Sequence, residues 1–322
     1  MATLITGLGY IGSALAARLL ADRKSVVGVE SFFSTDREAL APLEAANRFR
    51  LVEGSVTDPD TLERAFSELP IDTVYHTSGQ ATTDPRVASL EHTLTTNVVG
   101  ALRVLEACAA HNVPRFVLAS STRLYATPLP RRVSERSPIH APDAVHGSQL
   151  LSETLLETVQ RQAPDWRVHA VAARLGTVHG TSPVMKTDAR FLAVPHRFCW
   201  QAARGETLQV STGPSTLLAL IDVQDAVDGL IACAEQPGAP AVVNLAREVV
   251  SVFEIARVVE YLGALRGLGV RMDVQGPEPR LDGHTITSAL AARGFAPQID
   301  LAHSLGPVLD HYLRVSAGES AP

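Results

Sequence analysis

Short apolar runs alternate with longer segments of helical periodicity in the first half of the chain. The apolar runs are rich in β-branched residues and suit strands covered on both faces; they are residues 2–6, 26–30, 49–53, 73–76 and 116–120. Between them, apolar residues recur at helical spacing in residues 11–21, 61–69 and 97–110. This alternation predicts an α/β protein with a doubly wound parallel sheet and right-handed crossovers.

The pattern becomes less regular toward the C-terminus. A proline-rich stretch, 128–142, is followed by a predicted helix over 144–162 and a predicted strand over 168–175. Beyond Gly176 short elements alternate irregularly, and residues 242–245 are expected to form a late strand of the main sheet. We therefore expect one domain over residues 1–176, completed by that late strand, and a smaller, interleaved domain over residues 177–322.

Composition and charge narrow the class of protein. Of 322 residues, 46% are hydrophobic and 19% are charged, as in a soluble globular protein, and the net charge of −6 argues against a nucleic-acid partner. Cys108, Cys199 and Cys233 are too widely spaced for a metal cluster, and their odd number does not fit a disulfide framework. Without a signal peptide or a bilayer-spanning apolar stretch, we expect a cytoplasmic protein that uses neither a membrane nor a metal.

A glycine-rich turn follows the first predicted strand and opens the first predicted helix. Gly7 permits the tight turn, Gly9 lets the backbone approach a pyrophosphate, and Gly12 lets the helix pack close to the strand. The pyrophosphate would lie at the helix N-terminus, where unpaired N–H groups and the helix dipole favour anions. The motif predicts a Rossmann-like dinucleotide-binding domain whose loop contacts to the cofactor are Gly7, Gly9, Tyr10, Ile11 and Gly12.

Glu30 ends the second predicted strand, eighteen residues after the glycine-rich turn. An acid at this place accepts hydrogen bonds from the adenosine ribose, which favours NAD because a 2′-phosphate would meet a carboxylate. Ser31 and Arg37 could still hold a 2′-phosphate if Glu30 turns away. The residues alone leave the choice between NAD and NADP open.

Several stretches occur in the order found in the extended short-chain dehydrogenase/reductase family, which includes nucleotide-sugar epimerases and dehydratases, and the chain resembles this family over nearly its whole length. Residues 54–58 resemble the adenine-pocket turn, with Ser55 where the family has an aspartate, and residues 174–180 resemble the motif that meets the nicotinamide. The resemblance implies that Ser121 is the active-site serine. It implies further cofactor contacts at Ser55, Val56, Thr77, Ser78, Gly79, Asn97 and Ala119.

The helix after the serine strand departs from the family. The family carries a tyrosine there and, four residues later, a lysine, so that both lie on one helix face. The tyrosine protonates the carbonyl oxygen, while the lysine lowers the phenol's pKa and holds the nicotinamide ribose. In our alignment His146 takes the tyrosine's place and Leu150 the lysine's. Leucine carries no charge and binds no ribose hydroxyl, so the usual proton-transfer pair is absent.

A second departure concerns the substrate. Nucleotide-sugar members bind the substrate diphosphate with an arginine in a glycine-rich stretch, but residues 213–220 contain no basic side chain. Without that bidentate partner a diphosphate loses its main recognition, and an apolar pocket suits a large, flat or hydrophobic molecule instead. We expect substrate contacts at Thr122, Arg123, Thr177, His179 and Met185.

Three functions remain open. The first is a ketoreductase whose substrate supplies the proton, as a ketone beside an acidic phenol can, while Ser121 hydrogen-bonds the carbonyl oxygen. The second is a ketoreductase or epimerase-type oxidoreductase with His146 as the acid, since imidazole has a pKa of about 6.5. The third is a non-catalytic NAD(P)-binding sensor. We favour the first, because the glycine-rich turn, the serine strand and the whole substrate domain are all retained.

The pattern as a whole is similar to that of an atypical polyketide ketoreductase. That resemblance implies a ring ketone of an angucyclinone-like aromatic polyketide as the substrate. It implies NADP(H) as the cofactor, with NAD(H) as the alternative. Members of the wider family pair through helices that correspond to residues 97–110 and 144–162, which implies a homodimer.

Overall fold

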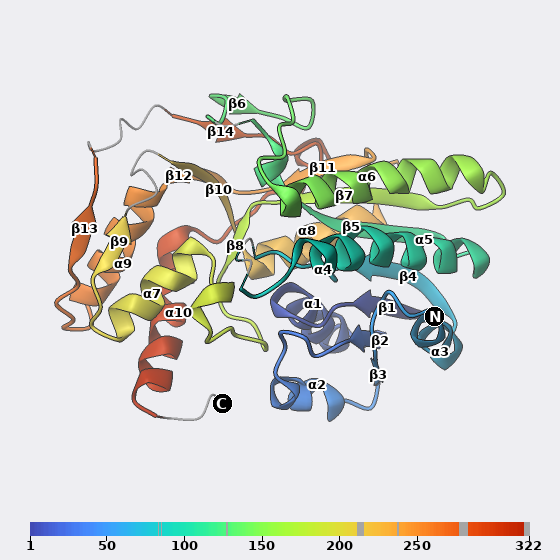
Figure 1. The fold of residues 1–322 in the computed structure, drawn as a ribbon, viewed down its shortest axis with the longest axis horizontal. Helices are drawn as coiled ribbons and strands as arrows, with labels where there is room; N and C mark the ends of the chain where they lie inside the picture. Colours follow the sequence, from blue (N-terminus) through green and yellow to red (C-terminus); the bar gives the residue numbers. More distant parts are fainter. Residues whose placement is uncertain are drawn as a thin grey trace.

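The computed structural model describes residues 1–82, 84, 86–126, 128–210, 216–236, 238–276 and 283–318. Within these residues the centre of the molecule is a seven-stranded parallel sheet (Figure 1). From one edge to the other its strands are β11 (Val242–Leu245), β7 (His169–Leu175), β5 (Arg115–Ser121), β4 (Ile71–His76), β1 (Ala2–Thr6), β2 (Ser25–Glu30) and β3 (Phe49–Glu53). The chain runs outward from β1 to β3 and then returns to β4 on the other side of β1, which makes the β1/β4 boundary the topological switch point. The predicted doubly wound architecture is confirmed.

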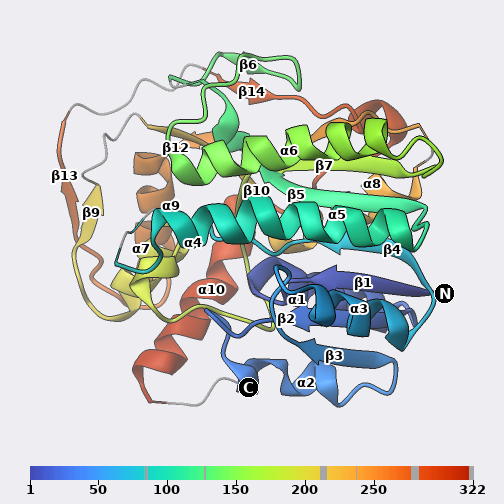
Figure 2. The same cartoon turned by 45° about the vertical axis from the view of Figure 1, so that its right-hand side comes forward.

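Helices cover both faces of this sheet (Figures 1 and 2). One face is covered by α1 (Tyr10–Ala21), α2 (Ala41–Glu44) and α8 (Val223–Glu235), and the other by α3 (Pro59–Glu68), α5 (Gly100–Ala110) and α6 (Ala144–Gln162). Successive strand residues point to opposite faces, so that Leu4 is buried in one apolar cluster and Ile5 in the other. Strands buried on both faces are apolar throughout, which explains the continuous runs in the sequence.

Helix boundaries follow local signals in one case and a tertiary contact in another. Asp58 caps α3 by accepting a hydrogen bond from the backbone N–H of Asp60 (3.2 Å), and Pro59 is the first helical residue. The expected helix over 97–110 instead begins as α4 (Leu90–Leu94), passes through a π-helical segment, Thr95–Val99, and continues as α5. In the widened segment Asn97 hydrogen-bonds the Gln80 backbone, a contact that periodicity does not reveal.

The second half of the chain builds a smaller layer beside the carboxyl ends of the parallel strands (Figure 1). In this layer β10 (Leu217–Asp222) pairs with both β12 (Glu248–Ser251) and β8 (Thr177–His179), and β13 (Met272–Val274) pairs with β9 (Leu208–Val210). A further strand, β14 (Thr285–Ile286), pairs with β6 (Arg132–Val133). A third apolar core lies among α7 (Val194–Ala203), α9 (Val252–Ala264) and α10 (Leu301–Ser316). Because β6 comes from the first half and β11 from the second, the halves interleave; the division at residue 176 remains a prediction.

Three features of the described residues bear on function. No helix among them has the length and apolar character needed to cross a membrane. Nor does this part of the chain gather three or more His, Cys, Asp or Glu side chains that could hold a metal ion. The thiols of Cys108, Cys199 and Cys233 are free and buried, and burial raises the pKa of each, so they are unreactive packing groups.

Candidate active site at the carboxyl edge of the sheet

The glycine-rich turn is packed so closely that its first and last glycines tolerate no side chain. Gly7 has a φ of +81°, and a Cβ there would lie 2.6 Å from the Cα of Ser78. A Cβ at Gly12 would lie 1.9 Å from the carbonyl oxygen of Gly7, whereas a Cβ at Gly9 would meet nothing nearer than 3.8 Å. Gly9 therefore faces open space, as a residue that lets a ligand approach the backbone must.

The N-terminus of α1 offers its N–H groups to an anion. The N-cap residue, Gly9, contributes no side-chain acceptor, so the first-turn N–H groups of the helix have no cap. The Thr77 hydroxyl donates to the carbonyl oxygen of Gly7 (2.8 Å) and ties the turn to the end of β4. An open backbone at Gly9 and an uncapped helix terminus are what a pyrophosphate requires, so these residues fit a dinucleotide.

Glu30 supports the glycine-rich turn from the end of β2. Its carboxylate accepts hydrogen bonds from the backbone N–H of Leu8 (2.7 Å) and of Phe32 (2.9 Å), and its side chain is buried. Glu30 thus holds two backbone segments in place. Ser31 beside it is exposed. Contacts of Glu30 and Ser31 with an adenosine ribose or a 2′-phosphate remain predictions.

The turn predicted to form the adenine pocket is held by its own hydroxyls. The Ser55 Oγ accepts from the backbone N–H of Thr57 (3.2 Å) and hydrogen-bonds the Thr57 hydroxyl (2.7 Å). Val56 is buried against α5, where a Cβ at Gly100 would lie 2.7 Å from its side chain. The close approach of Val56 to the helix explains why position 100 is a glycine.

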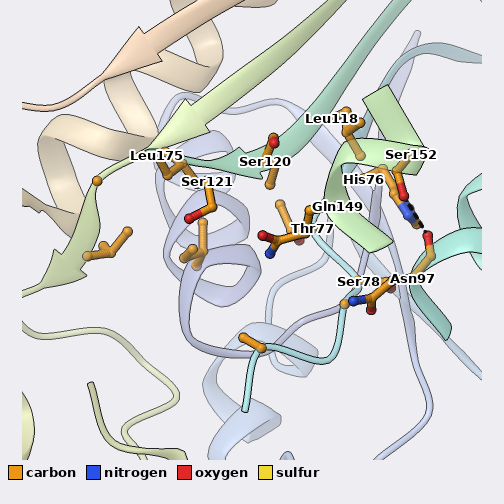
Figure 3. A pocket seen from close by; sticks show the side chains of 16 residues that line it. His76, Thr77, Ser78, Asn97, Leu118, Ser120, Ser121, Gln149, Ser152 and Leu175 are labelled. Carbon is orange, nitrogen blue, oxygen red and sulfur yellow. Dashed lines mark hydrogen bonds between the residues drawn. The ribbon is translucent and has the colours of Figure 1, made fainter. Parts of the chain in front are cut away.

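A cavity of about 210 Å³ opens at the carboxyl edge of the sheet, beside the switch point between β1 and β4 (Figure 3). This is smaller than the roughly 300–1,000 Å³ of a pocket that encloses a drug-sized ligand, so it would hold the reacting ends of two molecules rather than either one whole. Its lining residues are Ile11, His76, Thr77, Ser78, Gly79, Ala81, Asn97, Leu118, Ala119, Ser120, Ser121, Gln149, Ser152, Leu175, Gly176 and Val178.

The cavity brings together seven of the residues expected from the sequence and adds others. Ile11, the turn of Thr77, Ser78 and Gly79, and the trio of Asn97, Ala119 and Ser121 all line it, while their contacts with a cofactor or substrate stay predictions. Leu175, Gly176 and Val178, which also line it, belong to the stretch 174–180 that resembles the nicotinamide motif, whereas His76, Ser120 and Gln149 were not expected there. Their common feature is a position at the carboxyl end of a central strand, or on the helix face above it.

The face that α6 turns toward the cavity differs from our alignment. Gln149 and Ser152 line the cavity, and Val145, one turn before Gln149, is buried on the same side of the helix. Gln149 therefore occupies the place we assigned to Leu150, and Val145 the place we assigned to His146. A shift of one residue along a helix rotates a side chain by about 100°, so an amide and not an aliphatic side chain faces the cavity.

His146 is engaged at the start of α6. Its ring Nδ1 lies 2.7 Å from the Asp143 carboxylate, which also caps the helix by accepting from the His146 backbone N–H (3.0 Å). Burial, and secondarily the positive charge of Arg123, lowers the pKa of His146 below its ordinary value, so the ring is neutral at pH 7. The imidazole is not among the groups lining the cavity, and the geometry lends no support to its proposed role as an acid.

Ser121 lines the cavity with its oxygen already accepting one hydrogen bond. It ends β5 and caps the short helical turn Thr122–Leu124, because its Oγ accepts from the backbone N–H of Arg123 (3.1 Å). With an oxygen lone pair used in this way, the O–H group is left to donate elsewhere. The structure therefore places a hydrogen-bond donor where the family resemblance implies the active-site serine.

Asn97 shapes the cavity by holding the loop after β4. Its amide donates to the carbonyl oxygen of Gln80 (3.0 Å) and to the Ser148 hydroxyl (2.8 Å), and its Oδ1 accepts from the Gln80 backbone N–H (2.6 Å). These bonds use both ends of the amide. Asn97 thus joins the π-helical segment, the loop and α6, and we assign it a structural part in forming the cofactor site.

A buried polar network lies directly behind the cavity. The Ser120 hydroxyl donates to Glu153 (2.5 Å), and Glu153 forms an ion pair with Arg174, whose two bonds measure 2.6 and 3.0 Å. Arg174 also donates to the Tyr125 hydroxyl (3.1 Å), which in turn donates to Asn244 (2.6 Å). The network joins β5, α6, β7 and β11, and its members are satisfied by one another, so it supports the cavity wall without offering a free acid.

The walls of the cavity are electrically neutral at pH 7. The lining residues all belong to the described part of the chain. Among them His76 contributes an imidazole, and none of the others carries an imidazole, carboxyl, thiol, phenol or amine group. The His76 ring bonds the Thr6 hydroxyl (2.7 Å), and burial lowers the pKa of His76 to about 4. The cavity therefore holds hydroxyls, amides and apolar groups, and none of these donates a proton as an acid.

The residues expected to contact substrate lie around the cavity rather than on it. Thr177 begins β8, between the lining residues Gly176 and Val178, and Thr122 is buried. Arg123 is exposed and Met185 packs against the third core.

His179 is withdrawn further, at the end of β8. Its ring bonds the Ser304 hydroxyl (2.6 Å), and burial lowers the pKa of His179 to about 3. The sequence analysis found no basic residue in the stretch 213–220. Residues 213–215 lie outside the described residues, and residues 217–220 belong to β10. Substrate contacts in this region stay predictions.

Tyr10, the remaining loop residue, points away from the cavity toward the second half of the chain. Its hydroxyl donates to the carbonyl oxygen of Gly180 (2.7 Å), and burial holds the pKa of Tyr10 well above its ordinary value. The tyrosine links α1 to the segment after β8, so contact with a cofactor is left to its backbone N–H.

Comparison with known proteins agrees with this architecture. The model of the family described as "NAD dependent epimerase/dehydratase family" matches residues 3–246. UDP-glucuronic acid decarboxylase 5 of Arabidopsis thaliana is 27% identical over 321 residues, covering 97% of this chain and 89% of the relative. UDP-glucose 4-epimerase of Mycolicibacterium smegmatis is 28% identical over 243 residues, covering 75% of this chain and 74% of the relative.

Solved structures resemble the fold closely. UDP-glucuronic acid 4-epimerase from Bacillus cereus, in complex with NAD, superimposes with a TM-score of 0.83 at 21% identity and covers 100% of this chain and 99% of its own. UDP-glucose 4-epimerase from Thermotoga maritima, with UDP-glucose, gives a TM-score of 0.81 at 21% identity, with 98% and 100% covered. The match to the family model spans most of the chain and includes the glycine-rich turn and the serine strand. The chain therefore belongs to the NAD dependent epimerase/dehydratase family.

Proposed function

We propose that the protein is an NAD(P)H-dependent ketoreductase that reduces a ring ketone of an angucyclinone-like aromatic polyketide, with a phenol of the substrate as the proton source. The observation that carries the proposal is the neutral cavity. Gln149 stands where the family resemblance implies a cation, and Val145 where it implies a phenol. His76, the remaining imidazole at the cavity, is neutral at pH 7.

A reduction without an enzyme acid needs a substrate of particular chemistry. A bound nicotinamide supplies the hydride, and the oxygen of the reduced carbonyl must then gain a proton. A phenol beside the ketone provides that proton within the substrate, so the absence of the tyrosine slows the reduction less than it would for a ketone without a phenol. The chain's own part is to hold the reacting groups together, exclude water and donate the Ser121 hydrogen bond to the carbonyl oxygen.

We propose NADP(H) as the preferred cofactor, with NAD(H) as the alternative. Both oxygens of the Glu30 carboxylate accept backbone N–H groups, and Ser31 next to it is exposed, which supports room for a 2′-phosphate. The family description and the solved relatives in complex with NAD support the alternative. Calorimetric titration with NADPH and NADH decides between them; tighter binding of NADH would reverse the assignment.

The test of the main proposal is oxidation of NADPH by the purified protein in the presence of phenolic ring ketones. We expect turnover with ketones that carry a neighbouring phenol. Methylation of that phenol should abolish most of the turnover, because the methyl ether has no proton to give. Equal turnover of phenol and methyl ether would show that the proton comes from elsewhere.

A second candidate is an epimerase-type oxidoreductase acting on a nucleotide sugar. Its support is the relatives, whose names describe UDP-sugar epimerases and decarboxylases and not polyketide enzymes. Incubation with UDP-glucose or UDP-glucuronic acid and NAD, followed by chromatography of the sugar, tests it directly. Formation of a 4-epimer or of a decarboxylated sugar would establish this candidate over the ketoreductase. Tight dinucleotide binding without any turnover would instead favour a non-catalytic sensor.

We also propose a homodimer formed through the helices on the α5 and α6 side of the sheet. Leu94, Val99 and Leu151 are large apolar residues exposed on this side of the molecule. Light scattering during size-exclusion chromatography measures the mass in solution. The wild-type chain is expected at twice its 34.3 kDa, and Leu151→Glu nearer to a single chain.

A further inference from the structure

The Gln149 side chain reaches the cavity without a partner. Its Oε1 is buried and has no hydrogen-bond partner among the described residues, and a half-turn of the terminal amide exchanges this acceptor with the donor Nε2. Buried amides are normally hydrogen-bonded, and leaving one unsatisfied is costly. In Figure 3 the amide extends from α6 into the same space as Ser121 and Thr77. An unpaired primary amide on a cavity wall is thus placed to bind a ligand.

The Ser121 hydroxyl offers a second donor to the same cavity. The Ser121 Oγ accepts from the backbone N–H of Arg123 (3.1 Å), which leaves its hydrogen free for the cavity. Ser121 comes from β5 and Gln149 from α6, and both line one cavity. Ser120, the next hydroxyl along, is already committed to Glu153 (2.5 Å) and does not compete. Two uncommitted donors, a hydroxyl and an amide, therefore face one space.

We infer that Gln149 is a catalytic residue, whose amide N–H joins the Ser121 hydroxyl in a neutral oxyanion site for the substrate's ketone oxygen. The inference rests on the proposed ketoreductase function. In the step it serves, the carbonyl carbon accepts a hydride and its π electron pair moves onto the oxygen. The neighbouring phenol gives its proton to that oxygen, and the phenolate then regains a proton from water. The two donors stabilise the negative charge that develops in between.

A neutral amide suits this task better than the charged residue it replaces. With Val145 one turn before it, the described residues that line the cavity include no phenol whose pKa a cation would have to lower. An amide cannot titrate, so its donor is present at every pH at which the protein folds. The enzyme thereby contributes stabilisation of charge, and the substrate contributes the proton.

The experiment compares Gln149→Ala and Gln149→Glu with the wild-type protein, on a phenolic ring ketone that the wild type reduces. Gln162→Ala, an exposed glutamine at the end of the same helix, is the matched control and should behave as wild type. We expect Gln149→Ala to lower kcat by about 100-fold, the effect of removing one oxyanion donor. The affinity for NADPH, measured by calorimetry without substrate, should stay unchanged.

The glutamate variant separates a donor from a packing residue. A protonated carboxyl donates a hydrogen bond, whereas a carboxylate repels the developing alkoxide. The rate of Gln149→Glu should therefore fall as the pH rises through the pKa of the introduced carboxyl, over a range in which the wild-type rate stays level. A level profile for this variant as well, or an unchanged kcat in Gln149→Ala, would overturn the inference.

The remaining outcomes separate the inference from the function beneath it. Weaker NADPH binding by Gln149→Ala with intact kcat would assign the amide to the cofactor and would also overturn the inference, while leaving the ketoreductase standing. A wild-type protein that reduces no phenolic ketone would overturn the proposed function itself and the inference with it.

Discussion

The nucleotide end and the nicotinamide end of the cleft are built by different means. At the expected nucleotide end the groups on offer are backbone ones, because Gly7 and Gly12 have no room for a Cβ and Glu30 holds the N–H groups of Leu8 and Phe32. At the expected nicotinamide end they are side chains, since α6 turns Gln149 to the cavity and buries Val145 one turn before it. Dinucleotide binding therefore depends on the backbone fold, whereas the catalytic chemistry at the cavity can change by substitution on one face of α6.

The largest effect is expected from breaking the nucleotide end at Gly12. A Cβ there would lie 1.9 Å from the Gly7 carbonyl oxygen, so Gly12→Ala should displace α1 from β1 and abolish dinucleotide binding. Gly9→Ala has 3.8 Å of clearance in the free protein and should fold normally while binding the cofactor weakly, because the new methyl group occupies the pyrophosphate's place. Circular dichroism and calorimetric titration measure both. Tight dinucleotide binding by Gly12→Ala would contradict the conclusion that the nucleotide end depends on the close packing of its backbone.

The next effect is expected behind the nicotinamide end. Arg174→Met removes one partner of a buried ion pair and leaves Glu153 charged and unpaired, which should destabilise the protein by about 3–5 kcal/mol. The control is Arg103→Met, which breaks an exposed pair with Glu106 and should cost no more than about 0.5 kcal/mol. Urea denaturation gives both free energies of unfolding. Equal losses would mean that the buried network does not support the cavity wall.

Three buried histidines predict how stability depends on pH: His76 at the cavity, His179 at the end of β8, and His196 in α7, whose ring bonds the Tyr312 hydroxyl (3.1 Å). Burial lowers the pKa of His76 and of His196 to about 4 and that of His179 to about 3, against about 6.5 in an unfolded chain. Between pH 6.5 and 4 the unfolded state binds more protons, so stability is complete above pH 6.5 and is lost as the pH falls. We expect a loss of about 1–2 kcal/mol per histidine at pH 5.

Urea denaturation at pH 5 and pH 7 checks this prediction. A free energy of unfolding that is the same at both pH values would show that the buried rings are protonated without cost.

The smallest effect concerns α6 itself. Gly147 lies inside this helix, and a Cβ there would meet nothing within 4 Å. Gly147→Ala should therefore stabilise the protein by about 0.5–1 kcal/mol and leave turnover unaltered. Thermal denaturation and an assay on the same preparation measure the two. A loss of turnover would show that the helix must move during the reaction.

The sequence predicted the sheet and the nucleotide end because both leave local marks. Strands covered on both faces are apolar along their length, as residues 2–6 are, and Asp58 before Pro59 marks a helix start wherever it occurs. The conformation of the glycine-rich turn is likewise marked locally, by the glycines at positions 7, 9 and 12. The substrate side has no comparable mark, and His179, expected near the pocket, is instead buried against Ser304.

Tertiary structure alone decided which residue of α6 faces the cavity. The stretch around His146 can be aligned in two registers one residue apart, and nothing local distinguishes them. The choice is made by contacts with distant parts of the chain, since Ser148 bonds Asn97 and Glu153 pairs with Arg174. Those partners fix the rotation of the helix and so bring Gln149 to the cavity. A backbone turn is encoded where it lies, whereas the direction of a helical side chain depends on what the helix packs against.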